Sequence, residues 1–442
     1  MEDAYIIQGG KKLQGDATLS GAKNVALKTI IAALLFETPV TLENIPQIGD
    51  VIELLHLIKK LGGQAEFTDK NTVIIDGTTL KSRKLDLLHA SKVRVSFLFF
   101  APLLHKYKKD VFIPNPGGCR IGARPIDRSM DGMRALGVRV DYHHDTGYYE
   151  ASIEKEIGGN FTFAKVSHTG TELLIMLAVL GTNTITLKNA AFEPEIDNLI
   201  EFLNQSGAKI VREGDAITIE PVEKLNQKKP FSIMSDRNEA ITFAVAAILT
   251  KGDVTIHNIS TDLLKTFLTK LEEANCGVEV KDTQSIRFFY NGFINPVSIE
   301  TGVHPGFMTD WQPNWAVLMT QAEGYTIIHE RVFENRFAYV AELQKLGAMI
   351  QFIDPKVKNP KEFYEFNYDP DEVHLQAIEI HGPTTFHNGV LTVQDLRAGA
   401  TIAIAALSAP GESIINGASI LDRGYENFAA KIQSLGGVIK RV

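Results

Sequence analysis

Four cationic side chains stand at the starts of apolar helical segments, where cations are not expected. They are Lys23, Arg94, Arg237 and Arg397. The free N–H groups and the macrodipole of a helix N-terminus favour an anion and disfavour Lys or Arg. Cations at four equivalent places therefore indicate an anionic ligand, either a phosphate or a phosphate with a carboxylate. For Arg237, pairing with the adjacent Asp236 is the alternative interpretation.

A glycine-rich loop carries one of the two cysteines of the chain. Residues 115–127 read NPGGCRIGARPID, with three glycines and two prolines that favour neither a helix nor a strand. Cys119 is therefore expected to be exposed, beside Arg120 and close to Arg124. Nearby cations lower the pKa of a thiol and raise its reactivity. Cys276 lies at the end of a helical segment, and we interpret it as structural.

Asp310 begins a further helical segment and fits two roles. It can cap the helix as a first-turn carboxylate, or act as a general base, and spacing alone does not decide between them. The sequence shows no His/Cys cluster with zinc spacing, no Walker loop, no dinucleotide-binding glycine motif and no Gly-x-Ser-x-Gly elbow. We therefore expect neither a metal nor a cofactor.

The elements that position these residues recur along the chain. A glycine follows a helical pattern at positions 62, 137, 207, 277, 347 and 436. The recurrence predicts six units of about 74 residues in the 442-residue chain. Each unit reads as an apolar helix, a short strand, an amphipathic helix closed by the glycine at its C′ position, and alternating strands.

The first helix of each unit is apolar nearly all round, as in residues 172–180 and 240–249. A helix without a polar face must be buried on all sides. The sequence therefore predicts an α/β fold of two inside-out barrels, with helices at the centre, sheets outside and three units per lobe. We expect one lobe over residues 21–229. The other should combine 230–442 with 1–20, whose strands complete the last unit.

Composition narrows the function further. The net charge is −8, from 45 Lys and Arg against 53 Asp and Glu, which argues against a nucleic-acid partner. Two cysteines allow no disulfide framework. The acidic N-terminus lacks the pattern of a signal peptide, and no apolar run reaches the roughly 18 residues of a membrane span. We expect a cytoplasmic protein without a membrane partner.

Motifs throughout the chain resemble those of the UDP-N-acetylglucosamine 1-carboxyvinyltransferase family of enolpyruvyl transferases. The residues that carry the resemblance are 20–24 (SGAKN), 116–125 (PGGCRIGARP), 193–196 (EPEI), 307–312 (FMTDWQ), 333–337 (FENRF) and 395–397 (DLR). The family has two inside-out α/β lobes, which agrees with the burial argument. The resemblance implies transfer of the enolpyruvyl group of phosphoenolpyruvate to the 3′-hydroxyl of UDP-N-acetylglucosamine, with release of phosphate. This reaction opens peptidoglycan synthesis, on which cell shape and division depend.

The resemblance also implies roles for individual residues. Cys119 donates the proton to C3 of phosphoenolpyruvate and is the residue that the epoxide fosfomycin alkylates, while Asp310 is the base. Lys23 and Arg397 join them as catalytic residues that bind the anionic substrate. The implied substrate-binding residues are Asn24, Arg94, Arg124, Pro125, Ile126, Asp127, Lys165, Ser167, His168, Thr169, Val332 and Arg336.

The sequence departs from the family at three places. His168 and Thr169 stand where Val-Gly is common, Arg120 replaces a small residue, and residues 354–370 lengthen the fifth unit, where we expect a solvated loop. A transferase with another acceptor, such as shikimate-3-phosphate or a nucleotide, is the first alternative, although the shikimate enzyme lacks the cysteine loop. A regulatory paralogue that binds a UDP-sugar is the second, although it would be expected to lose Cys119, Asp310 or Arg397.

Overall fold

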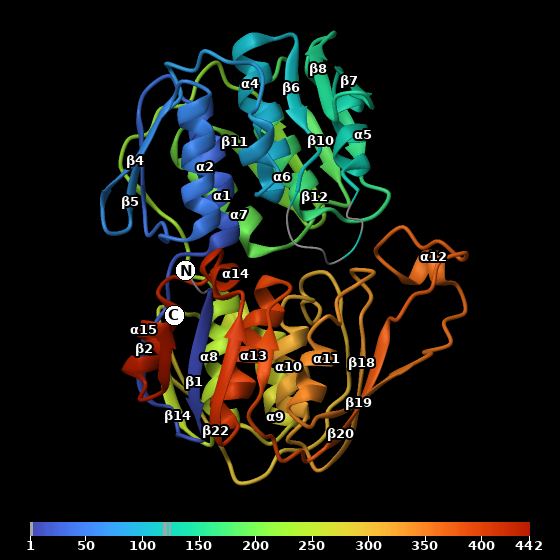
Figure 1. The fold of residues 1–442 in the computed structure, drawn as a ribbon. Coiled ribbons are helices and arrows are strands. Elements are labelled where there is room, and N and C mark those ends of the chain that lie inside the picture. Colours follow the sequence, from blue (N-terminus) through green and yellow to red (C-terminus); the bar gives the residue numbers. More distant parts are fainter. Residues whose placement is uncertain (1–2, 118–121, 123–124) are drawn as a thin grey trace. The chain divides into compact units, whose positions relative to one another are not determined.

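The computed structural model describes residues 3–117, 122 and 125–442, and its chain divides into two compact units (Figure 1). We call residues 21–117 and 125–234 the N-terminal unit, and residues 3–20 and 235–442 the C-terminal unit. Cys119, Arg120 and Arg124 lie outside the described residues.

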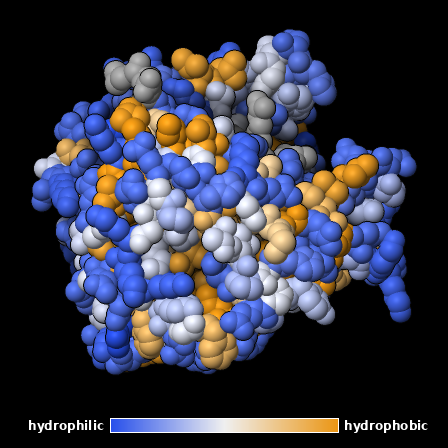
Figure 2. Space-filling view, turned by 60° about the horizontal axis from the view of Figure 1, so that its bottom comes forward, coloured by the Kyte–Doolittle hydropathy of each residue, from blue (hydrophilic) through white to orange (hydrophobic). Residues whose placement is uncertain are grey.

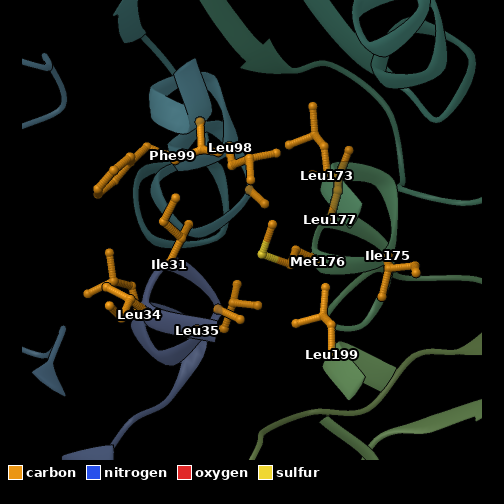
Figure 3. Packing of buried hydrophobic residues seen from close by; sticks show 14 of the residues in the cluster. Ile31, Leu34, Leu35, Leu98, Phe99, Leu173, Ile175, Met176, Leu177 and Leu199 are labelled. Atoms are coloured by element: carbon orange, nitrogen blue, oxygen red, sulfur yellow. The ribbon is translucent and has the colours of Figure 1, made fainter. Parts of the chain in front are cut away.

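The centre of the N-terminal unit is helical. Its apolar helices are α1 (Lys23–Ala32), continued by the 3-10 turn η1 (Ala33–Leu35), then η2 (Arg94–Phe99) with α4 (Phe100–Tyr107), and α6 (His168–Ala178). Figure 3 shows their side chains meeting, with Ile31, Leu98 and Met176 directed toward one another. All three are fully buried, as the absence of a polar face on these helices requires.

Amphipathic helices and sheets surround this centre. The helices are α2 (Gly49–Lys60), α3 (Leu87–Ala90), α5 (Asp127–Ala135) and α7 (Pro194–Gln205). One sheet joins β13 (Phe231–Ser232), β3 (Val40–Glu43), β5 (Thr72–Asp76) and β4 (Gln64–Asp69). The second joins β6 (Val111–Pro114), β8 (Tyr148–Ile153) and β7 (Val138–His143). The third joins β11 (Lys209–Glu213), β12 (Ala216–Glu220), β10 (Ile185–Lys188) and β9 (Gly159–Thr162).

The C-terminal unit repeats this design. Its central helices are α8 (Arg237–Leu249), α10 (Gln312–Met319) and α13 (Leu396–Ser408). Every residue of α8 and α10 is buried, including the polar ones. The peripheral elements are η3 (Thr261–Leu264), α9 (Lys265–Glu273), α11 (Val340–Lys345), α12 (Pro360–Phe363), α14 (Ala418–Asp422) and α15 (Phe428–Ser434).

The sheets of this unit include the strands at the chain's beginning. β15 (Gly277–Asp282), β16 (Ser285–Phe289), β14 (Asp253–His257) and β2 (Gln14–Thr18) form one sheet. β17 (Ile299–Glu300), β18 (Gly324–His329), β20 (Ala377–Gly382) and β19 (Met349–Ile353) form the next. In the last, β1 (Ala4–Gly9) lies between β22 (Gly411–Asn416) and β23 (Val438–Arg441), with β21 (Val390–Thr392) at the edge. Both N-terminal strands therefore complete sheets built from the C-terminal half.

Five of the six recurring glycines take the left-handed conformation expected after a helix, with φ between 87° and 102°. The exception is Gly277. There Asn275, with φ of 59°, turns the chain two residues earlier, because asparagine also tolerates this region. Gly277 instead starts β15, where an added Cβ would lie 2.4 Å from the ring of Phe289. Close packing, not backbone conformation, requires this glycine.

The extension at 354–370 is more than the solvated loop expected from the sequence. Tyr364 and Phe366 within it are only 4% and 5% exposed. Tyr364 packs on His329 of β18, and the guanidinium of Arg331 lies 4.1 Å from the ring centre of Phe363. An aromatic cluster thus anchors the segment to its sheet. On the face of the molecule that Figure 2 shows, hydrophobic residues are scattered among hydrophilic ones. After the segment, Val373 is 89% exposed.

The helices of the described chain are all too short or too polar to cross a membrane.

Candidate active site

Asp310 and two arginines form an ionic cluster in the C-terminal unit. Arg336 Nη2 donates to Asp310 Oδ1 at 2.7 Å, and Arg397 Nε donates to Oδ2 at 3.2 Å. Both guanidinium groups are almost fully buried, whereas the carboxylate is about a quarter exposed. The sequence separates these residues by up to 87 positions, and the structure brings all three together.

The helix geometry around Arg397 explains how a cation is held at a helix start. The Asp395 carboxylate caps α13 by accepting from the N–H groups of Arg397 and Ala398, both at 3.1 Å. Burial alone would lower the pKa of Arg397, but Tyr425 and the carboxylates of Asp310 and Asp236 raise it. Arg397 Nη1 is buried without a hydrogen-bond acceptor among the described residues, so this donor can serve an anion.

Glu330 supports the same cluster from β18's C-terminal end. Its side chain accepts hydrogen bonds from Thr309 Oγ1 at 2.9 Å and from the backbone N–H of Val332 at 2.7 Å. Burial would lower the pKa of Arg336, but Asp310, Asp395 and Glu330 together raise it. The cluster therefore keeps two permanent positive charges beside the Asp310 carboxylate. The helix α10 begins at Gln312, so Asp310 precedes the helix instead of lying in its first turn.

Lys23 is the cation at the start of α1 in the N-terminal unit. Its Nζ lies 2.8 Å from Asp50 Oδ2, in the first turn of α2, and both side chains are about nine-tenths buried. Asn24 follows on the same turn and is half-buried. Asp50 thus offsets the unfavourable meeting of an ammonium group with the N-terminal end of the helix macrodipole.

Arg94 differs from the expectation because it begins the 3-10 helix η2, not an α-helix. Its Nη1 donates to the carbonyl oxygen of Pro116 at 3.2 Å. Pro116 is part of the glycine-rich loop, so Arg94 contacts the described part of that loop directly.

Ser167 and His168 begin α6. Ser167 caps the helix by accepting from Gly170 N at 3.2 Å. His168 Nε2 lies 3.2 Å from Glu172 Oε1, one turn along the helix. On its other side, Glu172 Oε2 lies 3.3 Å from Lys28 Nζ of α1. Burial lowers the pKa of His168, but the carboxylates of Glu172 and Glu193 outweigh it, and the pKa is raised.

The remaining candidates are distributed over both units. In the N-terminal unit, Pro125 and Asp127 are exposed at the start of α5, Ile126 is buried, and Lys165 and Thr169 are half-buried near the start of α6. In the C-terminal unit, Val332 is half-buried beside Glu330. Arg237 is buried against Trp311, and its Nη1 lies 3.3 Å from His304 Nδ1, which favours a structural role.

Cys276 is buried, and burial raises the pKa of its thiol to about 12, in line with a structural residue.

The acidic partners of the cations were not predicted from the sequence. Asp50, Glu172 and Glu330 each hold a basic or polar group of the clusters above, but none lies in a motif that stood out. A charged residue within an apolar helical segment would have indicated such a partner. Lys28 lies within one apolar segment, and Glu172 begins another. Buried charges require partners, so two such residues on neighbouring helices could have been paired.

Comparison with known proteins identifies the class. The sequence family described as EPSP synthase (3-phosphoshikimate 1-carboxyvinyltransferase) matches residues 7–432. The chain therefore belongs to this family of enolpyruvyl transferases.

Individual relatives narrow the assignment. UDP-N-acetylglucosamine 1-carboxyvinyltransferase of Bartonella henselae is 37% identical over 454 aligned positions, covering 100% of this chain and 99% of the relative. The protein of the same name from Koribacter versatilis is also 37% identical, over 100% of this chain and 96% of its own. The resemblance inferred from the motifs is confirmed.

Solved structures confirm the fold. The enolpyruvyl transferase NikO from Streptomyces tendae superposes with a TM-score of 0.85 at 21% identity, covering 100% of this chain and 99% of that one. EPSP synthase from Acinetobacter baumannii gives a TM-score of 0.72 at 16% identity, with both chains fully covered. The predicted inside-out α/β architecture is therefore correct, while the sixfold repeat length stays a prediction.

Proposed function

We propose that this protein is an enzyme that transfers the enolpyruvyl group of phosphoenolpyruvate to the 3′-hydroxyl of UDP-N-acetylglucosamine, releasing phosphate. In a bacterial cell this is the first committed step of peptidoglycan synthesis. The observation that carries the chemistry is the Asp310 carboxylate held between the buried cations Arg336 and Arg397. Full-length similarity to transferases of this name supports the choice of acceptor.

The reaction adds the acceptor to a double bond and then eliminates phosphate. The 3′-hydroxyl oxygen attacks C2 of phosphoenolpyruvate, Asp310 takes the hydroxyl proton, and Cys119 gives a proton to C3. The C2–O bond to phosphate then breaks, and C3 returns a proton to the protein. The vinyl group is restored as an enolpyruvyl ether, and no cofactor is consumed.

The cations stabilise the negative charges that the substrate and the intermediate carry during this reaction. Phosphoenolpyruvate carries a carboxylate and a phosphate, and the tetrahedral intermediate keeps both. We assign Lys23, Arg94, Arg124 and Arg397 to these anions, with Arg336 fixing Asp310. Fixed cations in a site with little water stabilise developing charge without having to reorganise.

The sugar nucleotide is assigned to further residues of the N-terminal unit. Asn24 holds the sugar, the segment from Arg124 to Asp127 binds uridine, and Lys165, Ser167, His168 and Thr169 bind the diphosphate. The N-terminus of α6, capped by Ser167, adds N–H donors suited to phosphate oxygens. Val332 contributes from the C-terminal unit. The two units correspond in this proposal to the two lobes of the transferase.

A phosphate-release assay tests the proposal. Phosphoenolpyruvate would be offered with UDP-N-acetylglucosamine, UDP-glucose, UMP and shikimate-3-phosphate in separate reactions. We expect release with UDP-N-acetylglucosamine at least about 100-fold faster than with the others, since a site that hydrogen-bonds a substrate group rejects analogues lacking it. Equal or faster release with UMP or shikimate-3-phosphate would mean that this compound, and not UDP-N-acetylglucosamine, is the acceptor. No release of phosphate with any of the four compounds would overturn the enzyme assignment.

A further inference from the structure

Glu53, His56 and His89 gather on the surface of the N-terminal unit, apart from the groups described above. Glu53 and His56 are one turn apart on α2, which is labelled in Figure 1, and His89 belongs to α3. One ligand atom from each lies within 4.8 Å of the other two. Two imidazoles and a carboxylate are a donor set that first-row transition metals, zinc above all, accept.

A carboxylate lies near each nitrogen of the His89 ring. Its Nδ1 faces Glu53 Oε1 within contact distance, and its Nε2 lies 3.9 Å from Asp86 Oδ1, which is longer than a hydrogen bond. Metal-binding histidines commonly present one nitrogen to the ion and the other to a carboxylate, which fixes the ring and its tautomer. Asp86 is itself fixed, because it caps α3 by accepting from His89 N at 3.0 Å.

We propose that Glu53, His56 and His89 form a zinc-class metal site that links α2 to α3, with Asp86 orienting His89. Tetrahedral zinc with bonds of about 2.1 Å places its ligand atoms about 3.4 Å apart. The exposed ring of His56 reaches that spacing by rotation. Water completes the fourth position.

Lys92 sets the strength of the site. Its Nζ lies 3.2 Å from Glu53 Oε1, so the ammonium group competes with a cation for the same carboxylate. The Lys92 side chain is half exposed and can turn into solvent when the ion binds. The ion must therefore displace the ammonium group, and we expect its affinity to be lower than that of a structural zinc ion.

The site lies next to segments that carry proposed substrate residues. α2 holds Asp50, the ionic partner of Lys23, and α3 leads within four residues to Arg94. Metal binding would thus tie together the two segments that position these cations. The donor geometry alone carries the proposal, so it does not depend on the proposed function.

Zinc titration of the full chain by calorimetry is the test, with Cys119→Ser in every sample so that the loop thiol does not bind the ion. We expect one zinc per chain and a higher melting temperature when zinc is present. His56→Ala and His89→Ala should each abolish both effects. Asp86→Asn, which keeps a good helix cap, should weaken binding about 10- to 100-fold.

Two further variants separate this site from adventitious binding. Lys92→Met should tighten zinc binding, because the competing ammonium group is removed. His144→Ala changes an exposed histidine in the turn that follows β7 and should leave the titration unaltered. Absence of zinc binding, binding that survives His56→Ala and His89→Ala, or weaker binding by Lys92→Met would each overturn the proposal.

Discussion

Lys28 Nζ lies 3.3 Å from Glu172 Oε2, and the two side chains are only 5% and 0% exposed. The pair joins α1 to α6 in the N-terminal unit, and both side chains belong to helices that are otherwise mostly apolar. His168 Nε2 lies 3.2 Å from Oε1, the other oxygen of the same carboxylate. One buried carboxylate therefore links a lysine inside the helical core to a histidine at the proposed diphosphate site.

Replacing Lys28 by an uncharged residue of similar length should strongly reduce the stability of the folded protein. Lys28→Met leaves Glu172 buried without its ammonium partner, and breaking a buried pair in this way costs about 3–5 kcal/mol. The double variant Lys28→Met/Glu172→Leu should recover most of this loss, because it removes both charges. Urea unfolding of the single and double variants measures the difference. A double variant as unstable as the single one would contradict the paired arrangement.

His168 should make stability depend on pH. Its folded-state pKa is raised above the ordinary value of 6.5, with Glu172 and Glu193 as the carboxylates facing it and Lys28 as the opposing cation. A raised pKa means that the protonated form is stabilised by folding. This contribution is complete below about pH 6.5 and is lost as the pH rises through the folded-state value.

The test compares melting temperatures between about pH 5 and pH 9 for the protein and for His168→Val. The difference in stability between the two should shrink as the pH rises, since only the histidine loses its charge. An unchanged difference across the range would show that His168 does not titrate there.

The central helices could be predicted from the sequence because composition alone determines their burial. Residues 240–249 have no polar face, so only the inside of a barrel accommodates them, and all of α8 is buried there. Local chemistry was harder to predict. At Gly277 the rule for helix-ending glycines was wrong, because Asn275 turns the chain. The anchoring of Tyr364 on His329 depends on a tertiary contact that no local pattern encodes.

The placement of Lys23 and Arg397 at helix starts could be predicted from the sequence, but their acidic partners could not. Arg397 stood out because a cation at a helix start is unfavourable, and the structure places Asp310 beside it. Asp50 lies 27 residues after Lys23, in a different helix, and no period connects the two. His56 and His89 are 33 positions apart, so their grouping also became visible only with the fold.

Cysteine reactivity should separate the two thiols completely. Cys276 is buried with a pKa of about 12, so almost none of it is thiolate near neutral pH. Fosfomycin should therefore label Cys119 and leave Cys276 unmodified, faster when a UDP-sugar is bound. Peptide mass mapping after treatment identifies the labelled residue. Cys119→Asp should escape labelling yet keep activity, because a carboxylic acid can also protonate C3, whereas Cys119→Ser should be much less active. Label on Cys276, or full inhibition without label, would contradict the assignment of the loop cysteine.

Asp310→Asn should separate catalysis from binding. The amide keeps the shape of the side chain and still offers an oxygen to Arg336, but it cannot take the proton of the acceptor hydroxyl. Turnover in the phosphate-release assay should fall by about two to four orders of magnitude, the usual contribution of a general base. Binding of UDP-N-acetylglucosamine, measured by calorimetry, should survive.

A matched control distinguishes loss of the base from a general loss of charge. Asp371→Asn changes an exposed carboxylate in the same unit and should leave turnover and melting temperature unaltered. Asp310→Asn also removes a negative charge beside two buried arginines, so a modest drop in its melting temperature is expected. The decisive quantity is therefore turnover at saturating substrate and at a temperature where the variant is fully folded. Near-normal turnover under those conditions would mean that another group takes the hydroxyl proton, and that Asp310 serves only to neutralise Arg336 and Arg397.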